Sequence, residues 1–376
     1  MFDYEVLKLI WWVLIGVLLI GFALTDGFDM GAMALMPFVG KTDNERRVAI
    51  NTIAPHWDGN QVWFITAGGA LFAAWPMVYA VAFSGLYWAM LLVLFALFCR
   101  PVGFDYRSKV EDPRWHRTAD EQCPVPALVF GVAFGNLFLG LPFQLDELMR
   151  STYQGSFFAL LNPFPLLCGI VSLSMLSAHG GAWLMLRTDG ALAERSRQAT
   201  RLCVLVFLFG FVAAGLWLML GVQGFTQLSV TDPGAALNPL LDKQVVQDNA
   251  GWLGNYGRYP ITVIAPVAGI LGALLALLGS SRNSGGASFV GTSLMIVGSI
   301  CTAGFALFPF VFPSSLDPAS SLTIWDAVSS QKTLGIMFVV ACLFVPLILC
   351  YTLWSYVRMW GRLTQKTIEA NPHGLY

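Results

Sequence analysis

The stretch LIWWVLIGVLLIGFA, residues 9–23, decides the fold class of this chain. It is uncharged, it is longer than the apolar core of a signal peptide, and no A-x-A cleavage site follows it, so a retained membrane helix is expected. The whole chain of 376 residues has the same character, with 56% hydrophobic and 11% charged residues and a mean hydropathy of +0.67. This composition excludes a soluble protein and indicates an all-α integral membrane protein.

Further apolar segments follow along the chain. A helix needs about 20 apolar residues to cross a hydrocarbon core about 30 Å thick. Nine segments qualify or nearly qualify, and the fourth is the weakest: 9–38, 49–74, 79–99, 125–142, 163–186, 202–222, 259–280, 287–310 and 333–356. Since no linker and no strong internal repeat divides the chain, we expect residues 1–376 to form a single polytopic membrane domain with nine transmembrane helices.

The basic residues fall in alternate connections. Nearly all of them lie in the links 40–47, 100–117, 186–201 and 280–286 and in the tail after the last span. The connections 143–162, 223–258 and 311–332 hold few. The positive-inside rule therefore predicts an outside N terminus and a cytoplasmic C terminus. A net charge of -1 without a basic patch indicates no nucleic-acid partner.

Five ionisable residues lie inside the predicted spans: Asp26, Asp29, His56, Asp58 and His179. Charged groups in a membrane are costly and usually face a protein interior or water, so a functional role is the default hypothesis for the acidic ones. At 1.5 Å per residue, Asp29 and Asp58 both lie roughly 16–18 Å from the nearest cytoplasmic basic residues. Two antiparallel neighbouring helices would hold them at the same depth.

The segment APHWDGNQVW, residues 54–63, places polar groups along one predicted helix. His56, Asn60 and Trp63 share a face, and Asp58 and Gln61 share an adjoining one. Such a polar seam can hold water and suits a group that takes up and passes on protons. The sequence therefore predicts a proton path, with Asp105 just beyond the third span as a candidate entry point.

Structural interpretations stand beside these functional ones. Asp105 is also placed to form an ion pair with Arg100 or Arg107. Asp26 and Asp29 are equally suited to hydrogen bonds between helices, because Gly27 and Gly31 have the spacing of close helix packing. The third interpretation concerns His179, which lies among small residues and is expected to be a hydrogen-bonded core histidine.

Metal and haem ligands are not evident in the pattern. The seven cysteines lie mostly inside apolar segments without a CxxC motif, so we expect buried thiols rather than a metal site or disulfide framework. Haem iron needs axial His, Met or Cys ligands, and no pair at a suitable facing depth stands out. A redox role would therefore depend on a partner that holds the metal.

Long blocks of the sequence resemble subunit II of the cytochrome bd-type ubiquinol oxidases. They are DYEVLKLIWWVLIGVLLIGFALTDGFDMG (3–31), APHWDGNQVWFITAGGALFAAWPMVYAVAFSG (54–85), RPVGFDYRSK (100–109), GVAFGN (131–136), TAGFALFPFVFPSS (302–315) and SLTIWDAVSSQKTL (321–334). The resemblance runs over essentially the whole chain. It implies a respiratory terminal oxidase of the bacterial inner membrane, which oxidises quinol, reduces oxygen to water and generates proton-motive force with protons taken from the cytoplasm.

In that family, as the resemblance implies, subunit I carries two b-type haems, one d-type haem and the quinol site. Subunit II is a similarly folded nine-helix companion that ligates no haem. The partners expected for this chain are therefore subunit I in a heterodimer, ubiquinol, the lipid bilayer and, as further candidates, small single-helix accessory subunits. No catalytic residue and no metal ligand is expected in the chain itself.

The resemblance also assigns roles to residues. The HWDGNQ motif falls on 56–61 and the GFDYR motif on 103–107, so Asp58 and Asp105 would line a cytoplasmic proton path into subunit I. Asp29, His56 and Asp26 complete the predicted path. Trp63 would lie near the face toward subunit I, with oxygen access as a lower-ranked role.

One stretch departs from the family pattern. HRTADEQCPVPALVFG, residues 116–131, is more polar and shorter than the family's apolar run into the fourth helix. Asp120 and Glu121 would fall where that helix should enter lipid. Either the helix starts late, or a compensated frameshift changed residues 116–124 of the recorded sequence, and we favour the frameshift.

Two other functions are compatible with the residues alone. A proton-coupled secondary transporter would also carry intramembrane aspartates and glycine-broken helices. A purely structural scaffold would carry its acidic groups for packing. Copurification with a haem protein separates an oxidase subunit from a transporter.

Overall fold

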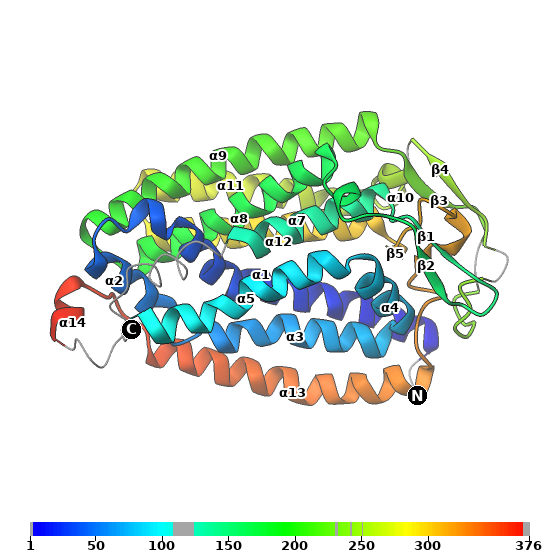
Figure 1. Ribbon diagram of the computed structural model, residues 1–376, viewed down its shortest axis with the longest axis horizontal. Coiled ribbons are helices and arrows are strands. Elements are labelled where there is room, and N and C mark those ends of the chain that lie inside the picture. The colour runs from blue at the N-terminus through cyan, green and yellow to red at the C-terminus, as the bar shows by residue number, and fades with distance from the viewer. Residues whose placement is uncertain (1–2, 108–123, 230–231, 241–242, 250, 371–376) are drawn as a thin grey trace.

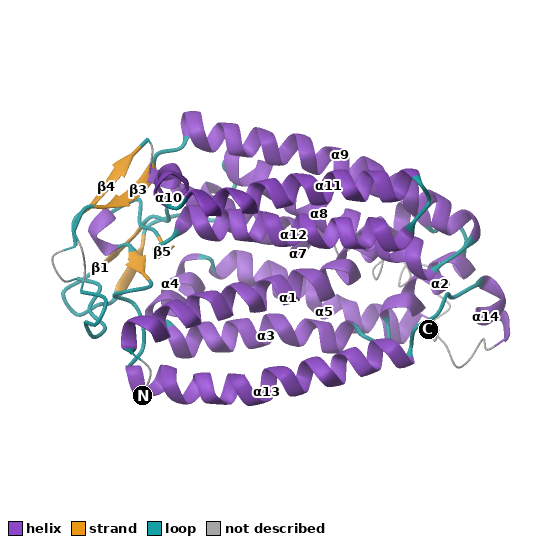
Figure 2. Cartoon of the chain, turned by 180° about the vertical axis from the view of Figure 1, so that it is seen from behind, coloured by secondary structure: helices purple, strands orange, loops and turns teal. Residues whose placement is uncertain are grey.

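The computed structural model describes all of the chain except residues 1–2, 108–123, 230–231, 241–242, 250 and 371–376, and except the side chains of 105–107, 367, 369 and 370. Long helices run side by side along the long axis of the molecule (Figures 1 and 2). They are α1 (Tyr4–Val39), α3 (Trp57–Ala74), α5 (Tyr87–Arg107), α7 (Pro124–Leu139), α8 (Pro163–Arg187), α9 (Gly190–Gly221), α11 (Ile264–Ser281), α12 (Gly285–Leu307) and α13 (Gln331–Arg358).

Short elements lie at the two ends of this bundle (Figure 1). One end, called here the strand end, carries three two-stranded antiparallel sheets that pair β1 (Phe143–Leu145) with β2 (Ser151–Tyr153), β3 (Gly224–Gln227) with β4 (Val245–Asp248), and β5 (Phe310–Phe312) with β6 (Leu322–Thr323). It also holds α10 (Gly254–Arg258). The other end, called the α2 end, carries α2 (Asp43–Ile53) and α14 (Gln365–Ala370).

Every predicted segment contains helix, but nine membrane crossings are not confirmed. Among the described residues, seven helices are long and apolar enough to cross a membrane, or up to eight if α3 and α4 (Pro76–Gly85) form one broken span. The counterpart of the weak fourth segment is α7, whose 16 described residues are fewer than the about 20 that a full crossing needs. The polar residues 116–123 before it lie outside the described part of the chain.

The second and third predicted spans are wrong as single helices. The segment 49–74 breaks between Ile53 and Trp57, because Pro55 has no N–H with which to continue the helical hydrogen bonds. The segment 79–99 breaks as well, because α4 ends at Gly85 and the long helix α5 begins at Tyr87. Before this segment, α4 turns by 120° from α3 at Trp75. These breaks place the HWDGNQ motif at the start of a helix rather than in its middle.

Helices α1 and α8 cross at very close range. A Cβ on Gly31 would collide with the backbone of Leu176 and Gly180, and one on Gly180 would collide with the backbone of Gly31. The side chain of Leu176 also fills the space beside Gly27. The expectation that Gly27 and Gly31 serve close packing is therefore confirmed, and the crossing fixes the depth of the neighbouring Asp26 and Asp29.

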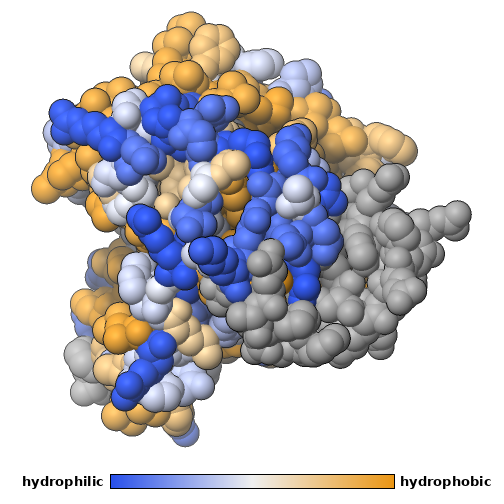
Figure 3. Space-filling view, turned by 90° about the vertical axis from the view of Figure 1, so that its left-hand side faces the viewer, coloured by the Kyte–Doolittle hydropathy of each residue, from blue (hydrophilic) through white to orange (hydrophobic). Residues whose placement is uncertain are grey.

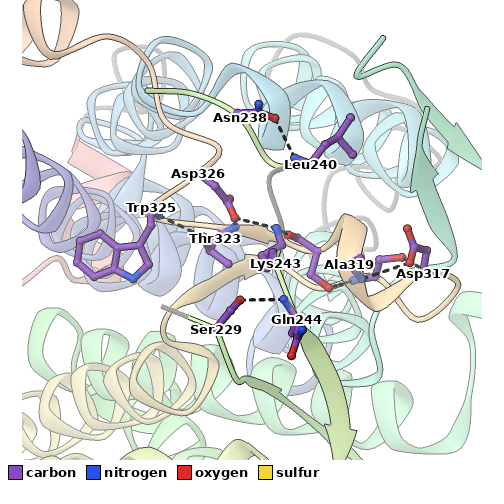
Figure 4. A network of polar contacts seen from close by, with 12 residues as sticks. Ser229, Asn238, Leu240, Lys243, Gln244, Asp317, Ala319, Thr323, Trp325 and Asp326 are labelled. Atoms are coloured by element: carbon purple, nitrogen blue, oxygen red, sulfur yellow. Dashed lines mark hydrogen bonds and ion pairs between the residues drawn. The ribbon is translucent and has the colours of Figure 1, made fainter. Parts of the chain in front are cut away.

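At the strand end, two buried lysines hold the connections together, and Figure 4 shows the one at Lys243. Lys243 Nζ lies 2.7 Å from Asp326 Oδ2, both side chains are at most 2% exposed, and the second Asp326 oxygen accepts from the Thr323 amide. Lys8, near the start of α1, donates to the carbonyl oxygens of Ala235 and Trp325. These bonds anchor the two long connections of the strand end on α1.

The α2 end is polar and basic. Figure 3 views the molecule from this end and shows hydrophilic side chains over much of the described surface. The exposed basic residues here include Lys41, Arg282, Arg358, Arg362 and Lys366. Among the described charged side chains exposed at the strand end, the acidic ones, Asp3, Glu5, Glu147, Asp232 and Asp248, outnumber the basic ones, Arg150, Arg258 and Lys332. The structure therefore gathers most of the basic links at the α2 end.

Glu45 organises the start of α2. Its carboxylate pairs with Arg195 of α9 at 2.5 Å and accepts from the amides of Lys41 and Thr42, while the Thr42 hydroxyl accepts from the Glu45 amide. Partial burial alone would raise the pKa of Glu45, but the bonds from Arg195 and the two amides outweigh it and hold the pKa below its ordinary value.

The cysteines differ from the expectation of buried thiols. The two on α13, Cys342 and Cys350, are exposed on the surface of this chain, and Cys99, Cys168, Cys203 and Cys301 are half-buried. The reason is the position of α13 at the edge of the bundle, where only 6% of its apolar window is buried within this chain. Cys123 lies outside the described residues.

Candidate functional site

Asp29 lies in α1 and its side chain is completely buried. One carboxylate oxygen, Oδ2, accepts a hydrogen bond of 2.8 Å from the Asn60 amide Nδ2. The other oxygen, Oδ1, has no hydrogen-bond partner among the residues that the structure describes. A buried carboxylate without full hydrogen bonding is unusual and points to a functional group.

Asn60 connects Asp29 to the last helix. Its Oδ1 accepts a hydrogen bond of 2.6 Å from the Tyr356 hydroxyl of α13. The Tyr356 ring in turn stacks on the His56 ring, with centroids 4.2 Å apart and planes inclined by 17°. Asp29, His56, Asn60 and Tyr356 are called here the Asp29 cluster, and it joins residues from α1, the start of α3 and α13.

Tyr356 is the member that sequence reasoning missed. It is a single tyrosine near the end of the last span, and no spacing rule links it to residues almost three hundred positions earlier. The predicted face of His56 and Asn60 is confirmed, because both side chains meet Tyr356.

Asp26 lies one helical turn before Asp29 and is paired with an arginine. Its carboxylate forms a buried ion pair with Arg100 of α5, and the two side chains are 0% and 1% exposed. The Arg100 guanidinium reaches both carboxylate oxygens. The two intramembrane aspartates therefore have different chemistry, since Asp26 faces a fixed cation and Asp29 faces an amide.

Asp58 does not join this cluster. It lies in the first turn of α3 and its side chain is exposed on the surface of the chain. Since each residue turns a helix by about 100°, Asp58 and Asn60 point in roughly opposite directions. The structure thus brings Asn60, rather than Asp58, to the level of Asp29.

The other predicted residues, Trp63, Asp105 and His179, lie outside the Asp29 cluster. Trp63 is half-buried and its ring lies against Gly21 of α1. Asp105 lies in the last turn of α5, and its side chain is outside the described residues. The core interpretation of His179 is confirmed, because its Nδ1 lies 2.8 Å from the Thr292 hydroxyl and its Nε2 lies 3.0 Å from the Leu24 carbonyl oxygen.

These positions bear on haem and metal binding. Both ring nitrogens of His179 are engaged in hydrogen bonds, which leaves neither available to an iron atom. Across the described ranges, no group of three or more His, Cys, Asp or Glu side chains could hold a metal ion. The described histidines therefore do not fit an axial haem ligand pair.

A large cavity lies apart from the Asp29 cluster. Its volume is about 900 Å³, and apolar side chains of α1, α3, α4 and α12 line it, among them Trp12, Phe64 and Phe305. A wall of this kind offers protons no chain of hydrogen-bonding groups. The cluster, and not this cavity, is the candidate site for proton chemistry.

Comparison with known proteins gives concordant matches. The family model described as cytochrome bd terminal oxidase subunit II matches residues 7–359. The chain is 54% identical over 380 residues to cytochrome bd-I ubiquinol oxidase subunit 2 of Escherichia coli K12, and 51% identical to the probable cytochrome oxidase subunit 2 of Haemophilus influenzae, with 100% of both chains covered in each case. The bd oxidase structure of Geobacillus thermodenitrificans matches its fold with a TM-score of 0.69 at 14% identity, covering 94% of this chain and 99% of that one.

Proposed function

Because the chain belongs to the cytochrome bd terminal oxidase subunit II family, we propose that its Asp29 cluster carries protons from the cytoplasm toward the haem-bearing subunit of the oxidase. The chain is subunit II of a respiratory quinol oxidase and therefore part of a terminal oxidoreductase. Relatives that match it over their full length favour this function over the proton-coupled transporter. Its several apolar helices make it a multi-pass protein of the bacterial inner membrane.

The observation that carries the proposal is the difference between the two buried aspartates. A proton carrier must change its protonation state without breaking a strong interaction. Asp26 would lose its ion pair with Arg100, whereas Asp29 keeps the Asn60 bond on Oδ2 and has Oδ1 available. Asp29 is therefore the proton-carrying group, and Asp26 with Arg100 provides a fixed pair of charges beside it.

The exposed face of α3 supports a route out of this chain. Asp58 and Thr66 are exposed on α3, where lipid would solvate neither side chain. A protein partner on this face would cover both. We place subunit I, with its similar fold, against the face formed by α3 and the neighbouring α13, so that Asp58 lies at the subunit boundary next to the Asp29 cluster.

The orientation follows from the charge distribution of the two ends. The basic α2 end would face the cytoplasm and the strand end the outside. With α7 as a short crossing, the chain then crosses the membrane nine times as a single membrane domain, with the N terminus outside. Asp105, at the α2 end of α5, would receive protons first, the Asp29 cluster with His56 and Asn60 would hold them on the buried Asp29, and Asp58 would pass them across the boundary to subunit I.

The oxidase haems, expected as haem b and haem d, belong in this proposal to subunit I together with the ubiquinol site. The engaged ring nitrogens of His179 support this assignment. Small accessory subunits would bind elsewhere on the lipid-facing surface. Trp63 would support the packing of α3 on α1, with oxygen access as its lower-ranked role.

The test replaces Asp29 by asparagine in the complete oxidase. Asp29→Asn keeps the size and the Asn60 neighbour but cannot carry a proton, so quinol-dependent oxygen consumption should fall at least tenfold while the haem content stays near that of the wild type. The matched control is Asp248→Asn in β4 of the strand end, which should leave the turnover unchanged. Wild-type turnover in Asp29→Asn would contradict the proposed function and leave the cluster a packing role.

A further inference from the structure

The Tyr356 hydroxyl holds the amide of Asn60 in one orientation. We infer that Tyr356 is a positioning residue of the proton path, which fixes the Asn60 amide so that its N–H faces Asp29 and the Oδ1 oxygen of Asp29 stays free to carry the proton. The inference rests on the proposed function of Asp29. It adds a residue on the last helix that no sequence motif connects to the path.

The chemistry of the three side chains leaves one arrangement. An asparagine side chain has one donating and one accepting end, and the two ends occupy opposite sides of the amide. The phenol donates to Oδ1 at 2.6 Å, which leaves Nδ2 to donate to the Asp29 carboxylate at 2.8 Å. The reverse orientation would set the amide oxygen against a carboxylate oxygen. The Asp29 carboxylate, which can only accept, excludes this reverse orientation, and the Tyr356 hydroxyl stabilises the remaining one by donating to Oδ1.

Tyr356 is itself held by contacts that do not involve Asn60. Its ring stacks on His56, and the chain just beyond it is fixed to α8. Arg187 of α8 donates to the carbonyl oxygen of Met359, and its guanidinium lies 5.3 Å from the Trp183 ring and 5.2 Å from the Trp360 ring. The hydroxyl is thus preorganised toward Asn60 by the packing of the end of α13.

Charged and titratable groups face Tyr356 from several elements. Asp29 and Asp26 approach from α1 and Arg187 from α8, all within electrostatic range of the hydroxyl, and His56 covers the ring ahead of α3. Loss of the hydroxyl changes the hydrogen bonding of Asn60 but leaves all four of these groups in place. A phenylalanine at this position therefore isolates the positioning effect.

The first experiment compares Tyr356→Phe with Tyr351→Phe in the intact oxidase. Tyr351 lies on the same helix and is 68% exposed on this chain, so it controls for loss of a tyrosine hydroxyl from α13. One hydrogen bond contributes about 1 kcal/mol, so Tyr356→Phe should lower turnover about fivefold and displace its pH profile, with normal haem content. Tyr351→Phe should change neither quantity.

Two results would overturn the inference while the function of Asp29 stands. One is a Tyr356→Phe enzyme with the wild-type rate and pH profile although Asp29→Asn is slow. The other is a slower Tyr356→Phe enzyme whose pH profile is unchanged, which would show a structural role. If Asp29→Asn itself turns over like the wild type, the proposed function fails and this inference fails with it.

A second measurement tests the coupling to Asn60 directly. If Tyr356 acts through Asn60, the double variant Tyr356→Phe with Asn60→Ala should be no slower than Asn60→Ala alone, because residues that act as one unit are not additive. Independent effects that multiply in the double variant would contradict the inference. Haem content serves as the measure of folding for every variant, and the infrared carboxyl band lost in Asp29→Asn should shift in Tyr356→Phe.

Discussion

Replacement of Arg100 by methionine would leave the buried carboxylate of Asp26 without its cation. Both side chains are almost fully buried, and two unit charges about 4 Å apart attract each other by about 4 kcal/mol at an effective dielectric constant of 20. Removal of one partner from a buried pair costs about 3–5 kcal/mol, because the remaining charge stays buried and uncompensated. We therefore expect Arg100→Met to destabilise the chain by about 4 kcal/mol.

The exposed pair of Arg150 and Asp146 provides the matched control. Its side chains are 74% and 38% exposed, so Arg150→Met should cost less than about 1 kcal/mol. A double variant, Asp26→Asn with Arg100→Met, removes both buried charges and should be more stable than Arg100→Met alone.

The assay heats the purified oxidase at one scan rate and follows the loss of haem absorbance. The expected order of midpoint temperatures is the wild type and Arg150→Met together, then the double variant, then Arg100→Met. The reasoning is refuted if Arg100→Met is as stable as Arg150→Met, or if the double variant is less stable than Arg100→Met. Either result would show that the pair does not hold α1 against α5.

Two further predictions concern helix packing and pH. Gly31→Val should prevent assembly, because any side chain there collides with the α8 backbone, whereas Gly16→Ala, which meets no atom within 4 Å, should give wild-type amounts of haem-containing complex in membranes. Since the pKa of Glu45 is lowered in the folded chain, its stabilisation is present above about pH 4.3 and lost as the pH falls through the lower folded value. Glu45→Gln should lower the stability of the folded chain by about 1 kcal/mol at neutral pH, and its stability should fall less than that of the wild type when the pH is lowered. An equal loss of stability in acid would refute the role of Arg195.

The membrane class of the chain and the grouping of its basic links were predictable from sequence. A backbone in lipid must satisfy its own hydrogen bonds, so a membrane protein of this composition needs long apolar helices. The first of them is visible in the uncharged residues 9–23. Because the basic residues fall in alternate links, we predicted that these links lie on one side of the membrane. In the structure, their exposed basic residues lie together at the α2 end. The breaks at Pro55 and at Leu86 were not predicted, because hydropathy reports how apolar a segment is and not where a helix ends within it.

For the candidate site too, some residues were predictable from sequence and others were not. Sequence alone identified Asp26, Asp29, His56 and the HWDGNQ motif, because a polar residue in an apolar segment is visible without any knowledge of its neighbours. It could not distinguish the roles of the two aspartates.

Only the tertiary structure decided which partner each aspartate has. Asp26 meets Arg100 from a position 74 residues away, Asp29 meets Asn60 from 31 residues away, and Asn60 meets Tyr356 from 296 residues away. Hydropathy and helical spacing report the environment along a single helix. The direction in which a side chain points across to another helix depends on where each helix begins and on how the helices cross, here on the break before Trp57 and on the close contact of Gly31 with Gly180.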